Sequence, residues 1–323
     1  MKAIVRHSYG SPDVLRLEDV DKPTVEDDSV LIRVRAASLN ALDWHFMRGA
    51  PLLARMGNGL RAPKTPGLGV DLAGLVEAVG KDVTGFRPGD AVFGRALGAF
   101  AEYARGTAGS FAPKPANISF EKAAAIAVAG STALQGLRDR GKLVPGQRVL
   151  INGAGGGVGT FAVQIAKALG GEVTAVCGTH NVDLVRSLGA DEVIDYTRED
   201  FTRSGQRFDL ILDVAASRSI AACRRVLGSG GTLVVVGAAG SGRSMVPIAT
   251  RVVAAKVWSR LGRERMSMFI AKITNADLLV LSELIGSGKV TPVVDRTYPL
   301  SETAAAMRYL EQGHSRGKVV ITV

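Results

Sequence analysis

Short stretches in the first third of the chain alternate between hydrophobic and polar residues. In "VLIRVRAAS", Ile32 and Val34 fall on one face, and Arg33 and Arg35 fall on the other. A period of two is typical of a half-buried β-strand. Further short runs bounded by Gly, Pro or Asp predict an all-β, barrel-like unit over residues 1–119.

The pattern changes at about residue 147, where Val- and Ile-rich strands alternate with apolar helices. This alternation predicts an α/β domain with a doubly wound parallel sheet and helices on both faces. The tail after residue 262 lacks another such period, so we expect it to rejoin the first domain. The predicted strands are 148–152, 172–176, 192–196, 208–214 and 232–237, with helices at 159–169, 182–188 and 219–227. The predicted domains are 1–119 with 263–323, and 120–262.

A cluster of five glycines follows the first strand of this α/β region, in "INGAGGGVGTFAVQIAKALG". Ala154, Gly156 and Gly159 fit the G-x-G-x-x-G pattern with Ala in the first place. Small residues allow a tight turn, close approach of a pyrophosphate and close helix–strand packing. The helix N-terminus adds free N–H groups and a positive dipole end. We therefore expect a dinucleotide here, held by Asn152, Ala154, Gly155, Gly156, Gly157 and Val158.

The end of the second strand indicates which dinucleotide is bound. A carboxylate there would select the ribose 2′-hydroxyl of NAD. The chain instead has Cys177, Gly178, Thr179 and His180, and its next acid is Asp183. Small polar groups and a potentially cationic histidine suit a 2′-phosphate, so NADPH is predicted over NADH. In the alternative interpretation His180 is an exposed residue at a helix start with no ligand.

Composition narrows the class of protein. The 323 residues include only two cysteines, too few for a disulfide framework or a four-thiolate zinc site. No signal-peptide core or long apolar run is present, so we expect a cytoplasmic protein without a membrane span. The net charge of +10 is dispersed along the chain. Dispersed charge favours a basic enzyme that attracts an anionic ligand over a nucleic-acid-binding protein.

Several motifs together resemble the medium-chain dehydrogenase/reductase superfamily, in its zinc-free quinone oxidoreductase branch, which includes zeta-crystallin. They include "NALDWHFMRG", "GVDLAGLVEAVG", "FRPGDAVFG", "STALQGL", the glycine turn, "LGADEVIDY" and "RGKVVITV". The resemblance implies a GroES-like catalytic domain built from both chain ends and a Rossmann domain between them. It also implies a homodimer or homotetramer.

The resemblance implies that no metal is bound. Zinc-dependent relatives place a Cys near Asn40 and a Gly-His-Glu near Gly69-Val70-Asp71, and neither thiolate nor imidazole stands at those positions. The histidines and cysteines elsewhere are too far apart in sequence to predict a compact tetrahedral set. Hydride transfer to an acceptor that is already electrophilic needs less help than alcohol oxidation, which depends on a Lewis acid.

The resemblance also points to catalytic candidates. Asn40 and Asp43 match an Asn-Pro-x-Asp pattern in which Ala41 replaces the proline. Asn40 would anchor the nicotinamide side or donate to the substrate oxygen, and Asp43 would brace the loop. His45 would donate a proton or bind substrate; a partly buried loop histidine is the alternative.

Further cofactor contacts come from the resemblance and from the ends of strands, where ligands sit in open α/β sheets. Arg316 and Lys318 could reach the cofactor, although a charged turn before the last strand is the favoured interpretation. The predicted contacts are Thr132, Thr179, His180, Tyr196, Val214, Ala215, Gly237 and Ala238.

These features predict an NADPH-dependent, zinc-independent reductase of quinones or of the activated C=C bond of enones and enals. The alternative is an NADPH-binding protein of zeta-crystallin type that mainly binds RNA or a protein partner and has weak reductase activity. In that case nucleic-acid binding should fall steeply with salt and compete with NADPH.

Overall fold

The fold is taken from a computed structural model, which describes residues 1–55, 58–236 and 264–323. The chain divides into two compact units. The first unit comprises residues 1–131, 273–288 and 292–323, and the second unit comprises residues 132–272 and 289–291. These divisions fall later along the chain than the boundaries expected at 119/120 and 262/263, which stay predictions.

The first unit is built on a seven-stranded sheet with the order β14-β15-β3-β4-β5-β7, in which β6 pairs with β3. All the pairings are antiparallel except that of β14 with β15. A separate antiparallel pair, β1 with β2, completes the β-structure described in this unit. The strands are β1 (Lys2–Val5), β2 (Arg16–Asp19), β3 (Ser29–Ser38), β4 (Asp71–Val79), β5 (Ala91–Arg95), β6 (Tyr103–Thr107), β7 (Phe111–Pro113), β14 (Val294–Pro299) and β15 (Lys318–Thr322).

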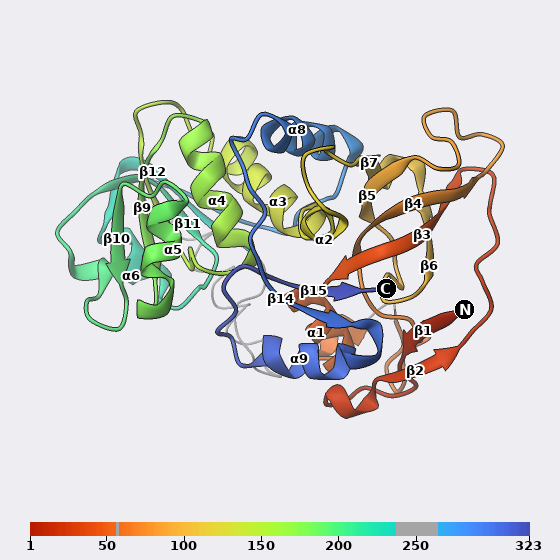
Figure 1. Cartoon of the computed structure of the whole chain (residues 1–323). Helices are drawn as coiled ribbons and strands as arrows, with labels where there is room; N and C mark the ends of the chain where they lie inside the picture. Colours follow the sequence, from red (N-terminus) through yellow and green to blue (C-terminus); the bar gives the residue numbers. More distant parts are fainter. Residues whose placement is uncertain (56–57, 237–263) are drawn as a thin grey trace. The chain divides into compact units, whose positions relative to one another are not determined.

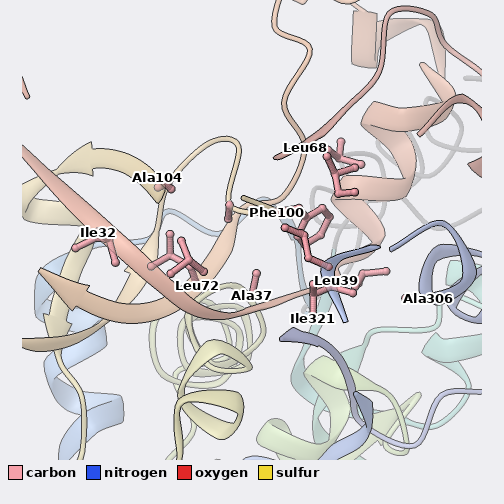
Figure 2. Packing of buried hydrophobic residues seen from close by; sticks show 14 of the residues in the cluster. Ile32, Ala37, Leu39, Leu68, Leu72, Phe100, Ala104, Ala306 and Ile321 are labelled. Atoms are coloured by element: carbon pink, nitrogen blue, oxygen red, sulfur yellow. The ribbon is translucent and has the colours of Figure 1, made fainter. Parts of the chain in front are cut away.

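The alternating apolar side chains of β3 are part of the hydrophobic core of the first unit. Ile32 and Val34 are buried while Arg33 and Arg35 are exposed, as the pattern predicts. Figure 2 shows the buried side chains of Ile32, Leu72 and Phe100 within one apolar cluster. The helices of this unit are α1 (Ala41–Arg48), α2 (Phe120–Ala124), α8 (Asn275–Gly286), α9 (Thr303–Glu311) and most of α3 (Ala127–Leu134).

The second unit contains a six-stranded parallel sheet with the order β10-β9-β8-β11-β12-β13. Counted along the chain from β8, this is the 3-2-1-4-5-6 order of a dinucleotide-binding sheet. Helix α4 packs against β8 and β9, and α5 packs against β9 and β10 (Figure 1). The elements are β8 (Arg148–Asn152), α4 (Gly157–Ala168), β9 (Glu172–Cys177), α5 (Val182–Ser187), β10 (Glu192–Asp195), β11 (Phe208–Asp213), α6 (Ile220–Arg224), β12 (Leu227–Val236) and β13 (Arg265–Phe269), with a π-helical turn at Gln135–Arg140.

The predicted fold class is confirmed, and the sixth strand is an addition. We did not predict a further strand of the parallel sheet after residue 262, yet Arg265–Phe269 pairs in parallel with β12 at the sheet edge. Its side chains are mostly half-buried, so it lacks the continuous apolar run of a central strand. Among the described residues, no helix is both long and apolar enough to cross a membrane.

Candidate active site

The glycine turn of the second unit joins β8 to α4 and is fixed against β9. The backbone N–H groups of Gly153 and Ala154 both donate to the carbonyl of Val176, at 3.0 and 2.9 Å. A Cβ on Gly159 would lie 2.1 Å from the carbonyl oxygen of Gly153, so only glycine allows the helix to pack this closely on the turn.

The same turn is open at Gly156. A Cβ there would meet only the Gly153 carbonyl oxygen, at 3.7 Å. Gly156 is the N-cap of α4 and no side chain caps the helix. The N–H groups of the first turn therefore lack intrahelical acceptors, as at every helix start. Backbone donors, a positive dipole end and space for close approach fit the pyrophosphate of a dinucleotide.

The structure gives Asn152 a bracing role at the end of β8. Its side-chain nitrogen donates to Asp213 Oδ1 at 2.7 Å and to Ser217 Oγ at 3.2 Å. Its carbonyl oxygen accepts the backbone N–H groups of Val214 and Ala215. Asn152 thus ties the segment after β11 to the turn through its side chain and carbonyl. Thr132 lies buried in α3, whereas the predicted contacts Gly237 and Ala238 lie outside the described residues.

Polar groups gather where β9 and β10 end. Thr179 Oγ1 donates to Asp195 Oδ2 at 2.6 Å and lies 3.0 Å from Thr197 Oγ1. Asp195 also accepts from the backbone and hydroxyl of Thr197, and these hydrogen bonds lower the pKa of its carboxyl group. The exposed side chains of His180 and Tyr196 flank this cluster, and a Cβ on Gly178 would lie 3.1 Å from the Tyr196 hydroxyl. The acid nearest the end of β9 is thus already engaged by hydroxyl groups.

Sequence reasoning missed Arg198 in this region. Its Nε lies 3.7 Å from Asp195 Oδ2, and its side chain is largely exposed. An exposed guanidinium beside exposed polar groups suits an anionic oxygen. Its signal in the sequence was its position three residues after the end of β10, where a ligand is expected.

The first unit holds a buried ionic cluster around Asn40, which we call the Asn40 cluster: Ser38, Asn40, Asp43, Asp71 and Lys318. Lys318 Nζ donates to Asn40 Oδ1 at 2.6 Å and to the Leu39 carbonyl at 2.8 Å, and lies 3.4 Å from Asp71 Oδ2. Asn40 Nδ2 donates to Asp71 Oδ2 at 3.0 Å. Both ends of the Asn40 amide are therefore engaged inside the protein.

Lys318 corrects one interpretation. We favoured a charged turn before the last strand for this residue, but Lys318 is the first residue of β15 and is 3% exposed. Burial raises the pKa of Asp71 and lowers the pKa of Lys318, while the attraction between the two charges opposes both shifts. The missed signal is a lysine at one end of an apolar run matched by an aspartate, Asp71, inside another.

Asp43 braces the start of α1. Its Oδ2 accepts the backbone N–H of Asn40 at 2.8 Å, which satisfies one of the donors that precede a helix. Its Oδ1 is buried and has no hydrogen-bond partner among the described residues. Burial raises the pKa of Asp43 to about 7, and the neighbouring charge of Asp71 acts in the same direction.

His45 lies on α1 outside this cluster. Its Nδ1 is 2.7 Å from the carbonyl oxygen of Ala50, which can only accept, so Nδ1 carries the proton. Nε2 is then the nitrogen that can accept or deliver a second proton. The half-buried Trp44 ring meets the His45 ring edge-on, with 4.6 Å between the ring centroids. Trp44 Nε1 donates to Glu311 Oε1.

The donor chemistry of the Asn40 cluster does not suit zinc. It offers an amide, the Asp71 carboxylate facing the Lys318 ammonium, the Asp43 carboxylate holding the Asn40 backbone N–H, and no thiolate or imidazole. Zinc requires a compact set of Cys, His or carboxylate ligands. No three His, Cys, Asp or Glu side chains in the described part of the chain lie close enough together to hold a metal ion.

Comparisons with known proteins agree with this architecture. Residues 26–116 match the family described as alcohol dehydrogenase GroES-like domain, and residues 188–321 match the family described as zinc-binding dehydrogenase. The chain is 36% identical over 336 residues to a 2-methylene-furan-3-one reductase of Solanum lycopersicum, covering 99% of the chain and 79% of that protein. It is 34% identical over 343 residues to a chloroplastic NADPH-dependent alkenal/one oxidoreductase of Arabidopsis thaliana, with the same coverage.

A solved structure shows that this similarity includes the fold. The quinone oxidoreductase from Coxiella burnetii superposes with a TM-score of 0.85 at 30% identity, covering 100% of this chain and 99% of that one. The chain belongs to the medium-chain dehydrogenase/reductase superfamily, in its quinone oxidoreductase branch. It is an oxidoreductase of the kind that uses a nicotinamide cofactor, which confirms the predicted family and enzyme class.

Proposed function

We propose that this protein is an NADPH-dependent, zinc-independent reductase that delivers hydride to quinones or to the activated C=C bond of α,β-unsaturated carbonyl compounds. The observation that carries this proposal is the Lys318 ammonium, which faces Asn40 and Asp71 at the positions where zinc-dependent relatives place ligands. Because these residues do not suit a zinc ion as Lewis acid, the acceptor itself has to be electrophilic.

The second unit would bind the cofactor with backbone N–H groups and with side chains near the ends of its strands. The turn Ala154–Val158 and the start of α4 would bind the pyrophosphate, and Thr179, His180, Tyr196 and Arg198 would surround the adenosine end. Asp195, the carboxylate beside the end of β9, is already engaged by Thr179 and Thr197, which supports a phosphorylated over an unphosphorylated ribose. When bound, NADPH supplies the hydride.

The first unit would complete the reaction through side chains. Asn40 and Asp43 act as positioning residues, because their polar atoms are largely engaged with Lys318, Asp71 and the start of α1. His45 is the proton donor that we assign, through Nε2. The names of the similar proteins, a furanone reductase, an alkenal/one oxidoreductase and a quinone oxidoreductase, all fit electrophilic acceptors. As in the family, we expect a homodimer or homotetramer.

Initial rates test this proposal. Purified protein is treated with a chelator, and oxidation of NADPH and of NADH is followed with an ortho-quinone and with a short enal. We expect rapid NADPH oxidation with at least one acceptor and slower NADH oxidation. Activity that appears only after zinc is added back would overturn zinc independence, and equal efficiency with both cofactors would overturn the preference for NADPH.

A further inference from the structure

Asn181 lies against the glycine turn of the second unit, although no sequence pattern assigns it a role there. It ends the 3₁₀ turn Thr179–Asn181 that follows β9, and it is the N-cap of α5. A Cβ on Gly155 would lie 2.6 Å from both Cγ and Nδ2 of Asn181, and 2.8 Å from its Cβ. The side chain of Asn181 therefore occupies the space that a side chain at position 155 would need.

This contact explains why position 155 is glycine. The dinucleotide-binding pattern places its small residues at 154, 156 and 159, whereas 155 is one of its variable positions. Gly155 does not have a positive φ, so its backbone conformation does not require glycine either. The requirement comes from Asn181, whose side chain packs directly on the Gly155 backbone.

Asn181 does not use its side-chain amide within the described part of the chain. Asparagine is favoured at helix N-caps because its side chain accepts a backbone N–H, but Asn181 makes no such bond to α5. Its Oδ1 is buried and has no hydrogen-bond partner among the described residues, and its Nδ2 donates to none of them. Polar groups that are withdrawn from water nearly always have a partner, so this amide points to a group from outside the protein.

The amide presents its donor end to the turn. Nδ2 is among the atoms nearest to Gly155, and the next residue, Gly156, leaves open space for the close approach of a ligand. The N–H₂ group suits an anionic oxygen such as that of a phosphate, while Oδ1, which would repel it, is buried. The backbone N–H groups at the start of α4 favour the same kind of ligand.

We propose that Asn181 is a further cofactor-binding residue, whose Nδ2 donates to an oxygen of the pyrophosphate at the glycine turn. The pyrophosphate is common to NADPH and NADH, so Asn181 strengthens the binding of both cofactors by the same factor. This distinguishes it from His180 and Arg198, which the proposed function places at the adenosine end. The inference rests on the proposed function in one respect, that a dinucleotide binds at this turn.

Isothermal titration calorimetry of the full chain with NADPH and with NADH tests the role of Asn181. Asn181→Asp keeps the size of the side chain and replaces its donor by a carboxylate. We expect the Kd values for NADPH and NADH each to rise by at least about tenfold, with their ratio unchanged. Ser187→Asp adds the same charge at the exposed last residue of α5 and should bind both cofactors as the wild type does. Arg198→Gln should instead weaken NADPH binding more than NADH binding.

A second variant keeps the test decisive if Asn181→Asp fails to fold. Asn181→Ser retains a favoured N-cap residue and removes the amide, so both Kd values should rise several-fold with little change in the Tm of the cofactor-free protein. Wild-type affinity for both cofactors in these variants would overturn the inference and leave the proposed function intact. A loss confined to NADPH would also overturn it, because Asn181 would then act on the 2′-phosphate. Wild-type protein that binds neither cofactor would overturn the proposed function and this inference together.

Discussion

The two units arrange their polar groups in opposite ways. In the second unit the candidate cofactor site consists of backbone N–H groups in one continuous turn, which is open at Gly156 and closely packed at Gly159. In the first unit the Asn40 cluster consists of buried side chains from separate segments, including β3, β4 and β15. The first arrangement leaves backbone donors available to a ligand. In the second, the polar side chains bond to one another and to the backbone, and so fix the loop.

The largest expected effect comes from removing the cation of the Asn40 cluster. Lys318→Met leaves Asp71 buried without its counter-charge, and breaking a buried ion pair in this way destabilises a protein by about 3–5 kcal/mol. Chemical denaturation of the full chain measures this change.

Two comparisons sharpen that result. Lys81→Met removes an exposed lysine that faces Asp27, and should change the free energy of unfolding by less than about 1 kcal/mol. The double variant Lys318→Met with Asp71→Asn should recover part of the loss, because the carboxylate is neutralised as well. If Lys318→Met behaves like Lys81→Met, the cluster does not stabilise the first unit.

The glycine turn should separate binding from folding. Gly156→Ala fits the fold, since its Cβ would meet nothing closer than 3.7 Å, but the methyl group fills the space needed by the pyrophosphate. We expect NADPH affinity to fall by about tenfold or more with little change in Tm. Gly159→Ala, whose Cβ would lie 2.1 Å from a carbonyl oxygen, should lower Tm itself. Fluorescence titration and thermal unfolding measure the two effects; wild-type NADPH affinity in Gly156→Ala would contradict the assignment.

His45 tests whether a side chain of the first unit acts in the chemistry. His45→Gln should lower kcat with an enal by about 10²-fold, the low end of general acid catalysis, and leave NADPH affinity unchanged. His7→Gln, at an exposed histidine in the same unit, is the matched control. Unchanged kcat in His45→Gln would mean that solvent protonates the product.

The last expected effect is a pH dependence of stability. Because burial raises the pKa of Asp43 from 3.8 to about 7, the folded protein holds this proton more tightly than the unfolded chain does. The contribution of Asp43 to stability is present below the lower value and is lost as pH rises through the higher one. Asp43→Asn should flatten this part of the stability–pH curve, and Asp82→Asn at the exposed surface should not. Parallel wild-type and Asp43→Asn curves would contradict the shift.

Most of the fold could be predicted because its signals are local. Period-two alternation located β3, and alternating apolar strands and helices located five of the six strands of the parallel sheet. The missed strand, Arg265–Phe269, lies at the sheet edge, where half-burial removes the apolar run that marks a central strand.

The two sites differ in predictability for the same reason. The turn at residues 153–159 lies within a single stretch of sequence, so its spacing, together with the strand before it and the helix after it, indicated a dinucleotide. In the Asn40 cluster, Asn40 and Lys318 are 278 positions apart along the chain, so no local pattern relates them. A lysine near an apolar strand looks solvated until the fold supplies Asp71 as its partner.

The central claim is that the enzyme moves hydride from NADPH to an electrophilic carbon without a metal. The most direct measurement uses chelator-treated protein, NADPH deuterated at the transferable C4 position and a short enal, with the product analysed by NMR. We predict one deuterium at the β-carbon of the reduced product and a primary isotope effect on the chemical step. Product that carries no deuterium from NADPH, or that forms only after zinc is restored, would contradict the account.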